Sequence, residues 1–349
     1  MATTTRDLLG HVEEGFRAGG WNLLYLSTAG EHPARYRVYR DNRAFTVRVY
    51  IWNITQGGGA ARSATDYRIQ NTGPGVDRFT PEIGGRTLIL GWWANEEIFA
   101  GFDYRRHSGP LGGSPSPQVG VAALQGAVLN GFAIHAKTSG ELAIAFRPDF
   151  IGTYADNLEP LHDAGQVPAE VNVLTRIAAQ EDVPAADIER EVANPRRRAL
   201  TQTMRALHAL DFRQRVLDAY THHCAVCSMQ LRLVEAAHIL PVAEPDSTNE
   251  TSNGISLCAL HHRAYDRAML TFDPDYKVHV NEKYVDELRR AGLHSKLPNF
   301  RRELRWSFGC RHIERIGRIQ SSSKEPTSYE DGSSSIKSAS PILSAQLWR

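Results

Sequence analysis

Alternating apolar and polar residues recur through the first 160 residues of the chain, between glycine-rich turns. Alternation with period two is typical of half-buried strands, so this segment is predicted to be β-rich. Two stretches, near residues 5–18 and 117–131, have helical spacing instead. We expect residues 1–160 to form one domain, either α+β or similar to a β-barrel. The strand-like runs are NLLYLST, ARYRVYR, AFTVRVYIWNI, TLILGWW, IFAGFDY and ELAIAFR.

The segment that follows is acidic, with eight acidic residues against one arginine over residues 155–189. Pro168 and Pro184 mark the expected first turns of two short helices, because proline is tolerated at the start of a helix. We therefore expect a helical linker over residues 161–200. At the end of the chain, residues 319–349 are rich in serine and poor in apolar residues, which predicts a disordered tail.

Charge changes sign along the chain. The 349 residues include 40 basic and 39 acidic residues, a net charge of +1. This sum combines −7 over residues 155–189 with +5 over 190–232 and +4 over 277–305, so it does not exclude a nucleic-acid partner. No run of about 18 apolar residues is present, so no membrane partner is expected. The N-terminus lacks the apolar run of a signal peptide, and we expect a cytoplasmic protein.

Two closely spaced pairs of ligand-type residues stand in the C-terminal half: Cys224 with Cys227, and Cys258 with His261. A CxxC turn directs both sulfur atoms at one point, and a second pair completes a tetrahedral Cys3His zinc site. Four protein ligands leave no open position, so this Zn2+ would be structural. The alternative is that these are buried small residues and a chance histidine. Cys310 stands apart and is interpreted as an ordinary thiol.

Three further polar residues near these pairs, His238, Asn253 and His262, are not needed for that zinc. Hydrolysis of a phosphodiester needs a base to deprotonate water and a cation to neutralise the developing charge. A strand histidine at 238 and a helix histidine at 262 could face each other, one as base and the other as ligand of a catalytic metal. Asn253 could brace the loop that carries His238. Spacing alone leaves two simpler interpretations open, a core histidine and an ordinary Asn-Gly turn.

These residues stand in an order that a known family shares. Residues 212–280 resemble the HNH nuclease domain, also called the His-Me finger or ββα-metal fold, in the subgroup C-x-x-C…AAHI-x-P…NG-x-x-L…H-x-x-[FY]-D. The resemblance implies a two-stranded hairpin and a helix around one divalent cation, Mg2+ or Mn2+, that attack DNA or RNA phosphodiesters. It also implies that His238 is the general base, Asn253 the loop brace and His262 a metal ligand. The two Cys/His pairs would correspond to the zinc knuckles of many members.

The sequence departs from this family at Ala237, where many members place a metal-binding Asp or His directly before the catalytic histidine. The catalytic metal would then need another ligand. The candidates are Asp266, one turn after His262, and Glu235, on the same strand face as Ala237.

The layout resembles restriction-type endonucleases, including modification-dependent ones, in which an N-terminal recognition domain precedes a C-terminal HNH module. We expect an α+β multidomain protein with a β-rich N-terminal domain, a helical connector and, over residues 201–305, a ββα-metal HNH domain with structural zinc. The expected function is metal-dependent cleavage of double-stranded DNA by a restriction endonuclease in antiphage defence. Arginine suits phosphate contacts, and the candidates for DNA binding are Arg196, Arg197, Arg198 and Arg263.

Cutting both strands with one site per chain would take two chains, so a homodimer is expected. Two other functions fit the same residues. Ala237 suggests a zinc-stabilised DNA-binding protein with a degenerate nuclease fold, and the N-terminal domain could instead gate a nuclease effector by binding a nucleotide second messenger. Four tryptophans are candidates to stack on a flipped or modified base: Trp21, Trp52, Trp92 and Trp93.

Overall fold

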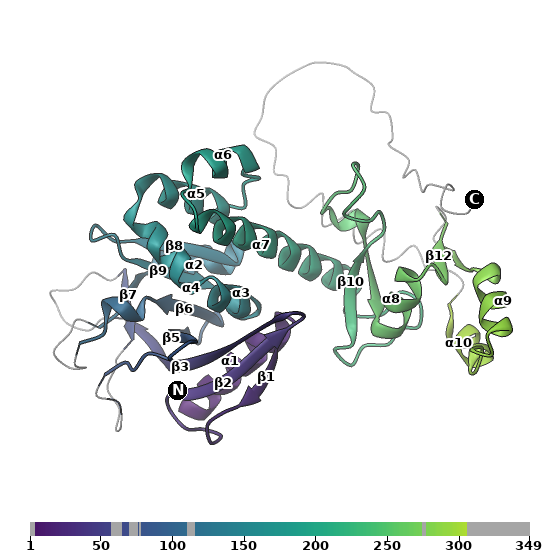
Figure 1. Ribbon diagram of the computed structural model, residues 1–349, viewed down its shortest axis with the longest axis horizontal. Helices are drawn as coiled ribbons and strands as arrows, with labels where there is room; N and C mark the ends of the chain where they lie inside the picture. Colours follow the sequence, from purple (N-terminus) through teal and green to yellow (C-terminus); the bar gives the residue numbers. More distant parts are fainter. Residues whose placement is uncertain are drawn as a thin grey trace, which may run out of the picture. The chain divides into compact units, whose positions relative to one another are not determined.

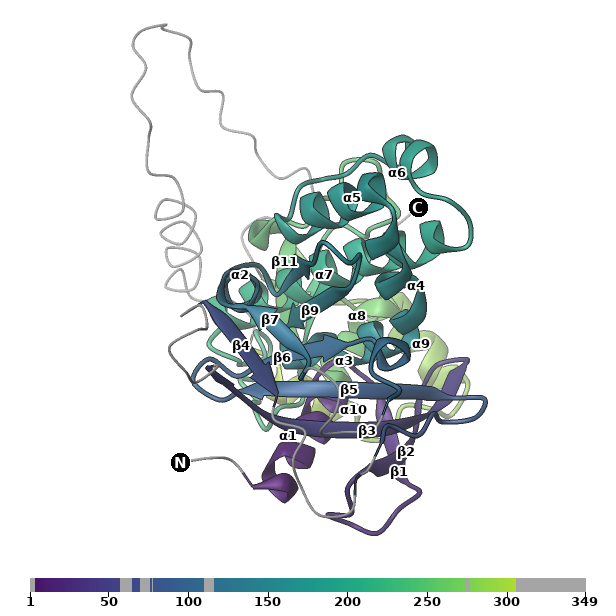
Figure 2. The same ribbon diagram turned by 90° about the vertical axis from the view of Figure 1, so that its left-hand side faces the viewer.

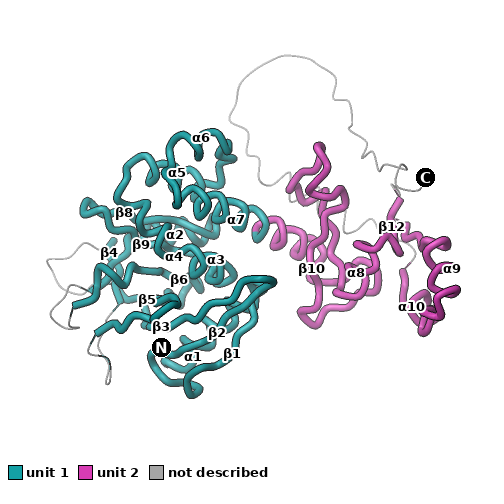
Figure 3. Tube along the Cα trace, in the orientation of Figure 1, with its two compact units in different colours: residues 1–210 teal, residues 211–349 magenta. Residues whose placement is uncertain are grey.

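The structure is a computed structural model that describes residues 4–56, 65–69, 76, 78–109, 116–273 and 277–305. The predictions for Cys310 and for a disordered tail over 319–349 concern residues outside these ranges. The chain divides into two compact units, residues 1–210 and residues 211–349, which are described separately (Figure 3). No helix within the described ranges is long and apolar enough to cross a membrane.

A nine-stranded mixed sheet forms the frame of the first unit (Figure 1). Its strands are β1 (Asn22–Tyr25), β2 (Ala34–Arg40), β3 (Arg43–Gln56), β4 (Asp66–Ile69), β5 (Arg86–Trp93), β6 (Ile98–Phe102), β7 (Gln118–Gly120), β8 (Phe132–Ala136) and β9 (Leu142–Phe146). Seven follow the order β1-β2-β3-β5-β6-β9-β8, while β4 pairs with β3 and β7 with β4. The described pairs are antiparallel except for β3 and β5. Because this path ends at β1 and β8 among the described strands, the sheet is open, and the barrel-like alternative does not apply.

Helices cover both faces of this sheet (Figures 1 and 2). They are α1 (Thr5–Ala18), α2 (Val121–Asn130), α3 (Ile151–Asp156), α4 (Leu158–Asp163), α5 (Pro168–Ala178), α6 (Ala185–Glu191) and α7 (Arg196–Ala219), with short 3-10 turns at Tyr104–Arg106, Pro148–Phe150 and Ala164–Gln166. Strand β9 shows how the faces divide. Leu142, Ile144 and Phe146 pack with α1 and with α3 to α7, whereas Ala143 and Ala145 pack with α2. A strand buried on both faces explains why ELAIAFR is apolar at successive positions.

Several predicted helix starts agree with the structure. The helix expected over residues 5–18 is α1, whose N-cap Thr4 accepts a hydrogen bond from the Asp7 amide. Helix α5 begins at Pro168, and α6 begins directly after Pro184. Helices α4 to α7 place apolar side chains in the core of the first unit. The segment expected to be a linker, residues 161–200, therefore packs as part of that unit.

The second unit is built around a hairpin and a helix. Strand β10 (Val234–His238) pairs antiparallel with β11 (Gly254–Cys258), and α8 (Ala259–Asp266) follows directly. The end of α7, from Phe212 onward, packs into the same core. This is the hairpin and helix that the resemblance implied, and the expected α+β class is confirmed. The remaining elements are the 3-10 turn Thr251–Asn253, the paired strands β12 (Leu270–Phe272) and β13 (Val278–Val280), and the helices α9 (Glu282–Arg290) and α10 (Leu297–Glu303).

Candidate metal centre and nuclease site

The four predicted zinc ligands come together in the second unit. Cys224 and Cys227 lie in the turn after α7, Cys258 ends β11, and His261 lies in the first turn of α8. The turn is closed by a hydrogen bond from the Ser228 amide to the Cys224 carbonyl, at 2.8 Å. One ligand atom from each of the four residues lies within 4.8 Å of all the others. Sequence positions 37 residues apart therefore converge on one point.

The distances in this cluster fit a bound zinc ion. A tetrahedron with Zn–S bonds of about 2.3 Å has S···S edges of about 3.8 Å. The Sγ atoms of Cys227 and Cys258 are 3.8 Å apart, and His261 Nδ1 lies 3.6 Å from Cys224 Sγ and 3.2 Å from Cys258 Sγ. Hydrogen bonding with Cys258 lowers the pKa of Cys224 well below its usual value, which favours a thiolate at this position. Three cysteines and a histidine form a closed donor set, so this cluster could hold structural zinc.

His238 ends β10, and two neighbours fix its ring. The ring stacks on Phe212 with centroids 4.0 Å apart and an interplanar angle of 10°. Its Nε2 lies 3.0 Å from Oδ1 of Asn249. Because an amide oxygen can only accept, Nε2 carries the hydrogen and Nδ1 keeps its lone pair. The ring is half-buried, and in its neutral form Nδ1 is the nitrogen that can accept a proton.

Asn253 holds the chain directly after His238. Its Oδ1 accepts from the Leu240 amide at 2.8 Å, and its Nδ2 donates to the carbonyls of Leu240 and Thr248 at 3.2 and 2.8 Å. Its own carbonyl accepts from the Ile239 amide at 2.8 Å. These bonds tie both ends of the loop to one side chain.

Close packing against α7 requires glycine at position 254. It pairs with His238 across the hairpin, and its φ of −117° is open to any residue. A Cβ atom at this position, however, would lie only 2.1 Å from Cγ2 of Val216 and 3.1 Å from Cζ of Phe212. Only glycine lets β11 approach α7 this closely, so the Asn-Gly pair is more than an ordinary turn.

His262 lies between two carboxylates. Its Nδ1 is 2.6 Å from Oε2 of Glu235, and its Nε2 is 3.6 Å from Oδ1 of Asp266. Because the carboxylates meet opposite nitrogens, the three residues do not converge on a single point. In the described part of the chain, only the Cys3His cluster has the compactness of a preformed metal site.

Three supporting residues escaped sequence reasoning: Asn249, Phe212 and Arg215. Arg215 donates to the Asn249 carbonyl at 2.8 Å and to Thr251 Oγ1 at 2.9 Å, and so holds the loop that contacts His238. Phe212 and Arg215 stand three residues apart on α7, a spacing that places them on neighbouring positions of one helix face. That spacing was the only available signal, because their partners lie far along the sequence.

The predicted DNA-binding arginines differ in their surroundings. Arg196 forms an ion pair with the buried Glu170, at 2.5 and 2.8 Å, which makes it part of the fold of the first unit. Arg197 donates to the carbonyls of Glu189 and Val192. Arg198 and Arg263 are exposed. We therefore retain only these last two as candidate phosphate contacts.

The four tryptophans proposed to stack on a base are mostly core residues. Trp21 and Trp92 are each 2% exposed. Trp52 and Trp93 are half-buried, and Trp52 stacks on Tyr50 with an interplanar angle of 10°. Their packing accounts for these side chains without a ligand.

Comparison with known proteins divides the chain in the same way. Residues 224–273 match a family described as HNH endonuclease, and residues 45–155 match one described as Methylase-associated X1. Among curated proteins, none matches the chain. The first match covers β10, β11, α8 and the Cys3His cluster, so the second unit contains an HNH endonuclease domain, which supports nuclease activity on DNA.

Proposed function

We propose that this chain is a metal-dependent DNA endonuclease of the restriction type. Cleavage belongs to the HNH domain within residues 201–305, and recognition of double-stranded DNA belongs to the first unit. The observation that carries the proposal is the position of His238, held by Phe212 and Asn249 within a segment that matches HNH endonucleases. A match described as methylase-associated supports the restriction role, since restriction depends on the methylation state of DNA.

His238 acts as the general base in this proposal. Its Nδ1 accepts a proton from water, whose oxygen forms a bond to phosphorus as the bond from phosphorus to the leaving oxygen breaks. The leaving oxygen takes a proton from solvent. Hydrogen bonding of Nε2 to Asn249 stabilises the imidazolium that forms, because the ring nitrogen donates to a fixed acceptor. Asn253 keeps the base in place by holding the loop.

His262 and Asp266 are the residues that would hold the catalytic Mg2+ or Mn2+. Their Nε2 and Oδ1 atoms are 3.6 Å apart, a separation that two ligands of one ion can have. Glu235 accepts from Nδ1 on the other side of the ring and orients it, as carboxylates commonly do for metal-binding histidines. When bound, the cation supplies neutralisation of charge on the phosphate and the leaving oxygen. Ala237 takes no part in this arrangement.

The remaining expectations follow from the reaction. Zinc in the Cys3His cluster would be structural, because no ligand position remains open. The HNH match is the single segment 224–273, so we expect a homodimer to be needed to cut both strands. A DNA substrate and a role in defence are consistent with a cytoplasmic enzyme.

The test is cleavage of plasmid and phage DNA, with and without modified cytosine, in Mg2+ or Mn2+. We expect cleavage by the wild type, loss of about 10²-fold or more in His238→Ala, and no loss in His294→Ala. His294 is an exposed histidine of the same unit and serves as the matched control. DNA binding without turnover in any divalent metal would contradict the proposal and favour a degenerate nuclease fold.

A further inference from the structure

Two adjoining cavities of the first unit form one open groove, here called the arginine groove. Their volumes are about 440 and 470 Å3, and they share five lining residues. The walls are the β2–β3 turn, helices α3 and α4, and the first half of α7. Together the cavities are lined by five arginines, Arg40, Arg43, Arg86, Arg198 and Arg205, against only two acidic residues, Asp41 and Asp156.

The β2–β3 hairpin places two of these arginines, Arg40 and Arg43, directly opposite each other, where their like charges repel. Asp41 and Asn42 form its two-residue loop, so Arg40 and Arg43 are directly opposed in the register. Like charges opposed in this way destabilise a sheet. The same hairpin opposes Arg35 and Arg48, but there the buried Glu82 pairs with both, at 2.6 and 3.1 Å.

Compensation in the groove is less complete. Arg43 pairs with Asp156, whereas the nearest carboxylate to Arg40 is the exposed Asp41, at 3.8 Å. Surface pairs of this kind contribute little. The positive charge of the groove therefore exceeds what its own acidic residues neutralise.

Stacking and hydrogen bonds hold two of the arginines in position. The guanidinium carbon of Arg40 lies 4.9 Å from the centre of the Trp21 ring, and Nη1 donates to the Gly19 carbonyl at 3.1 Å. Arg86 lies 5.9 Å from the centre of the Phe45 ring. An arginine stacked on an aromatic ring keeps its planar fork available for an anion at a lower entropic cost.

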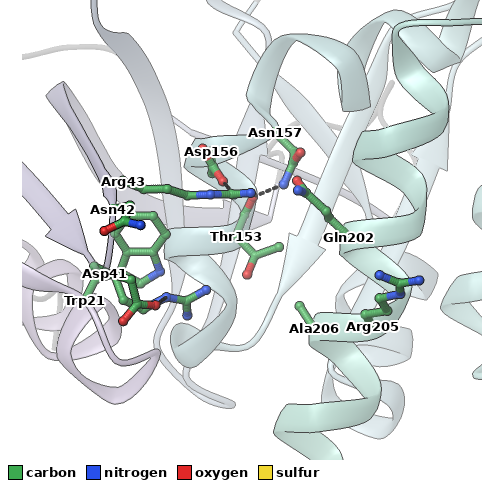
Figure 4. A pocket seen from close by; sticks show the side chains of 11 residues that line it. Trp21, Asp41, Asn42, Arg43, Thr153, Asp156, Asn157, Gln202, Arg205 and Ala206 are labelled. Carbon is green, nitrogen blue, oxygen red and sulfur yellow. Dashed lines mark hydrogen bonds and ion pairs between the residues drawn. The ribbon is translucent and has the colours of Figure 1, made fainter. Parts of the chain in front are cut away.

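Gln202 connects the walls of the groove. Figure 4 shows its amide close to the tips of Arg43 and Asn157. With the amide oxygen turned to the arginines, it accepts from Arg43 Nη2 at 2.8 Å and Arg198 Nε at 3.2 Å, while its nitrogen donates to Asn157 Oδ1 at 3.0 Å. Two guanidinium groups on one neutral oxygen remain positively charged. Arg198, Gln202 and Arg205 follow a helical spacing that lines one side of α7.

We propose that the arginine groove binds the phosphate backbone of the DNA that the second unit cuts. Arginine forks match phosphate oxygens, and the exposed side-chain amide of Asn42 is a group that can hydrogen-bond to a base edge. The arginines come from the β2–β3 hairpin, from β5 and from α7, so positive charge extends along the groove, as an extended polyanion requires. This inference rests on the proposed nuclease function and names the DNA contact surface of the first unit.

The test is DNA binding in the His238→Ala background, which keeps the duplex intact while zinc remains bound. Arg198→Ala/Arg205→Ala removes two exposed groove arginines, and Arg6→Ala/Arg17→Ala removes two exposed arginines of α1 outside the groove. Fluorescence anisotropy with a labelled duplex from a plasmid that the wild type cuts gives Kd as a function of salt. We expect the groove variant to bind at least about tenfold more weakly, with a salt slope smaller by about 2. The control variant should bind within about twofold of its parent.

Equal Kd and equal salt slope in the groove variant and its parent, with equal thermal unfolding midpoints, would overturn the inference. An equal loss in the control variant would do so too, because the effect would then be one of net charge. Groove-dependent binding of a free nucleotide or of polyglutamate, with DNA binding unchanged, would assign the groove another ligand. If the wild type cuts DNA while the groove variant binds normally, only the groove assignment fails. If the wild type neither binds nor cuts DNA, both the groove assignment and the proposed nuclease function fail.

Discussion

At the scale of single residues, the two nitrogens of His262 meet different carboxylates, Glu235 and Asp266, which the sequence offered as alternative metal ligands. Glu235 meets Nδ1 at 2.6 Å and Asp266 lies 3.6 Å from Nε2. One histidine nitrogen can bind a metal while the other donates to a carboxylate. The two acids therefore have different expected roles, which their variants can separate.

Asp266→Ala should raise the Mg2+ or Mn2+ concentration needed for half-maximal cleavage, because it removes a proposed ligand. Glu235→Ala should lower cleavage by about 10- to 100-fold, and Glu235→Gln should restore much of it, because the amide oxygen still accepts from Nδ1. Titration of cleavage against metal concentration measures both effects. An unchanged metal requirement in Asp266→Ala would remove it from the ligand set.

Gly254→Ala should destabilise the second unit by about 1–3 kcal/mol, because its Cβ would overlap Val216. Gly10→Ala is the matched control. Gly10 lies within α1 with nothing within 4 Å of the added Cβ, so this change should stabilise by about 0.5–1 kcal/mol. Denaturant unfolding of both variants measures the two effects. A stable Gly254→Ala protein would show that α7 and β11 can move apart at little cost.

At the scale of elements, sequence patterns predicted the helices whose positions depend on interactions between nearby residues. The amphipathic run ending at Ala18 and the proline at 168 gave correct helix positions, since period and cap signals act within a few residues. Strands β4, β7 and β8, by contrast, were not among the predicted strands. The Cys/His spacing predicted the zinc cluster, but the contact of His238 with Asn249 depends on how a loop folds back, which no local pattern records.

Helix α4 carries a histidine that makes the first unit sensitive to acid. His162 is buried between Tyr154 Oη, at 2.9 Å, and the Leu142 carbonyl, at 3.0 Å. Burial lowers its pKa from 6.5 to about 4, against the opposing effect of Asp103. The unfolded chain then binds more protons than the folded chain below about pH 6.5. Stability should be fully present above pH 6.5 and fall as the pH drops towards 4, by about 3 kcal/mol.

Denaturant unfolding of the first-unit transition between pH 7 and pH 4.5 measures this loss. His162→Gln keeps polar groups but does not titrate, so its stability should fall less over the same range, even if it starts lower. Parallel pH profiles for the two proteins would show that other groups cause the acid sensitivity.

At the scale of the whole molecule, the two units have separate cores. The buried core residues of the first unit end at Leu207, and those of the second begin at Phe212. The net charge of +1 is the sum of acidic and basic segments along the chain. For this reason the total says nothing about whether one part of the chain binds nucleic acid. Properties of the molecule should therefore be resolved unit by unit.

Zinc chelation should affect one unit only. Calorimetry is expected to show two thermal transitions, and a chelator should abolish or strongly lower the second-unit transition, because zinc binding contributes folding free energy directly. Cys227→Ser should have the same effect without a chelator. Movement of both transitions, or of neither, would contradict structural zinc confined to the Cys3His cluster.

The hydrogen bonds of Asn253 should also protect the chain from a chemical reaction at the Asn253–Gly254 bond. Asparagine is thermolabile. A following glycine leaves its own backbone nitrogen unobstructed to attack the asparagine side-chain carbonyl and expel ammonia, and water then opens the resulting ring to aspartate or isoaspartate. In the folded chain, bonds to Leu240 and Thr248 hold that side chain away from such a reaction. Removal of zinc should destabilise this unit and release the Asn253 side chain. Asn253 should therefore deamidate faster when the protein is stored without zinc. Peptide mapping should find aspartate accumulating in place of Asn253 in zinc-free samples, so that loss of activity becomes permanent even after zinc is restored.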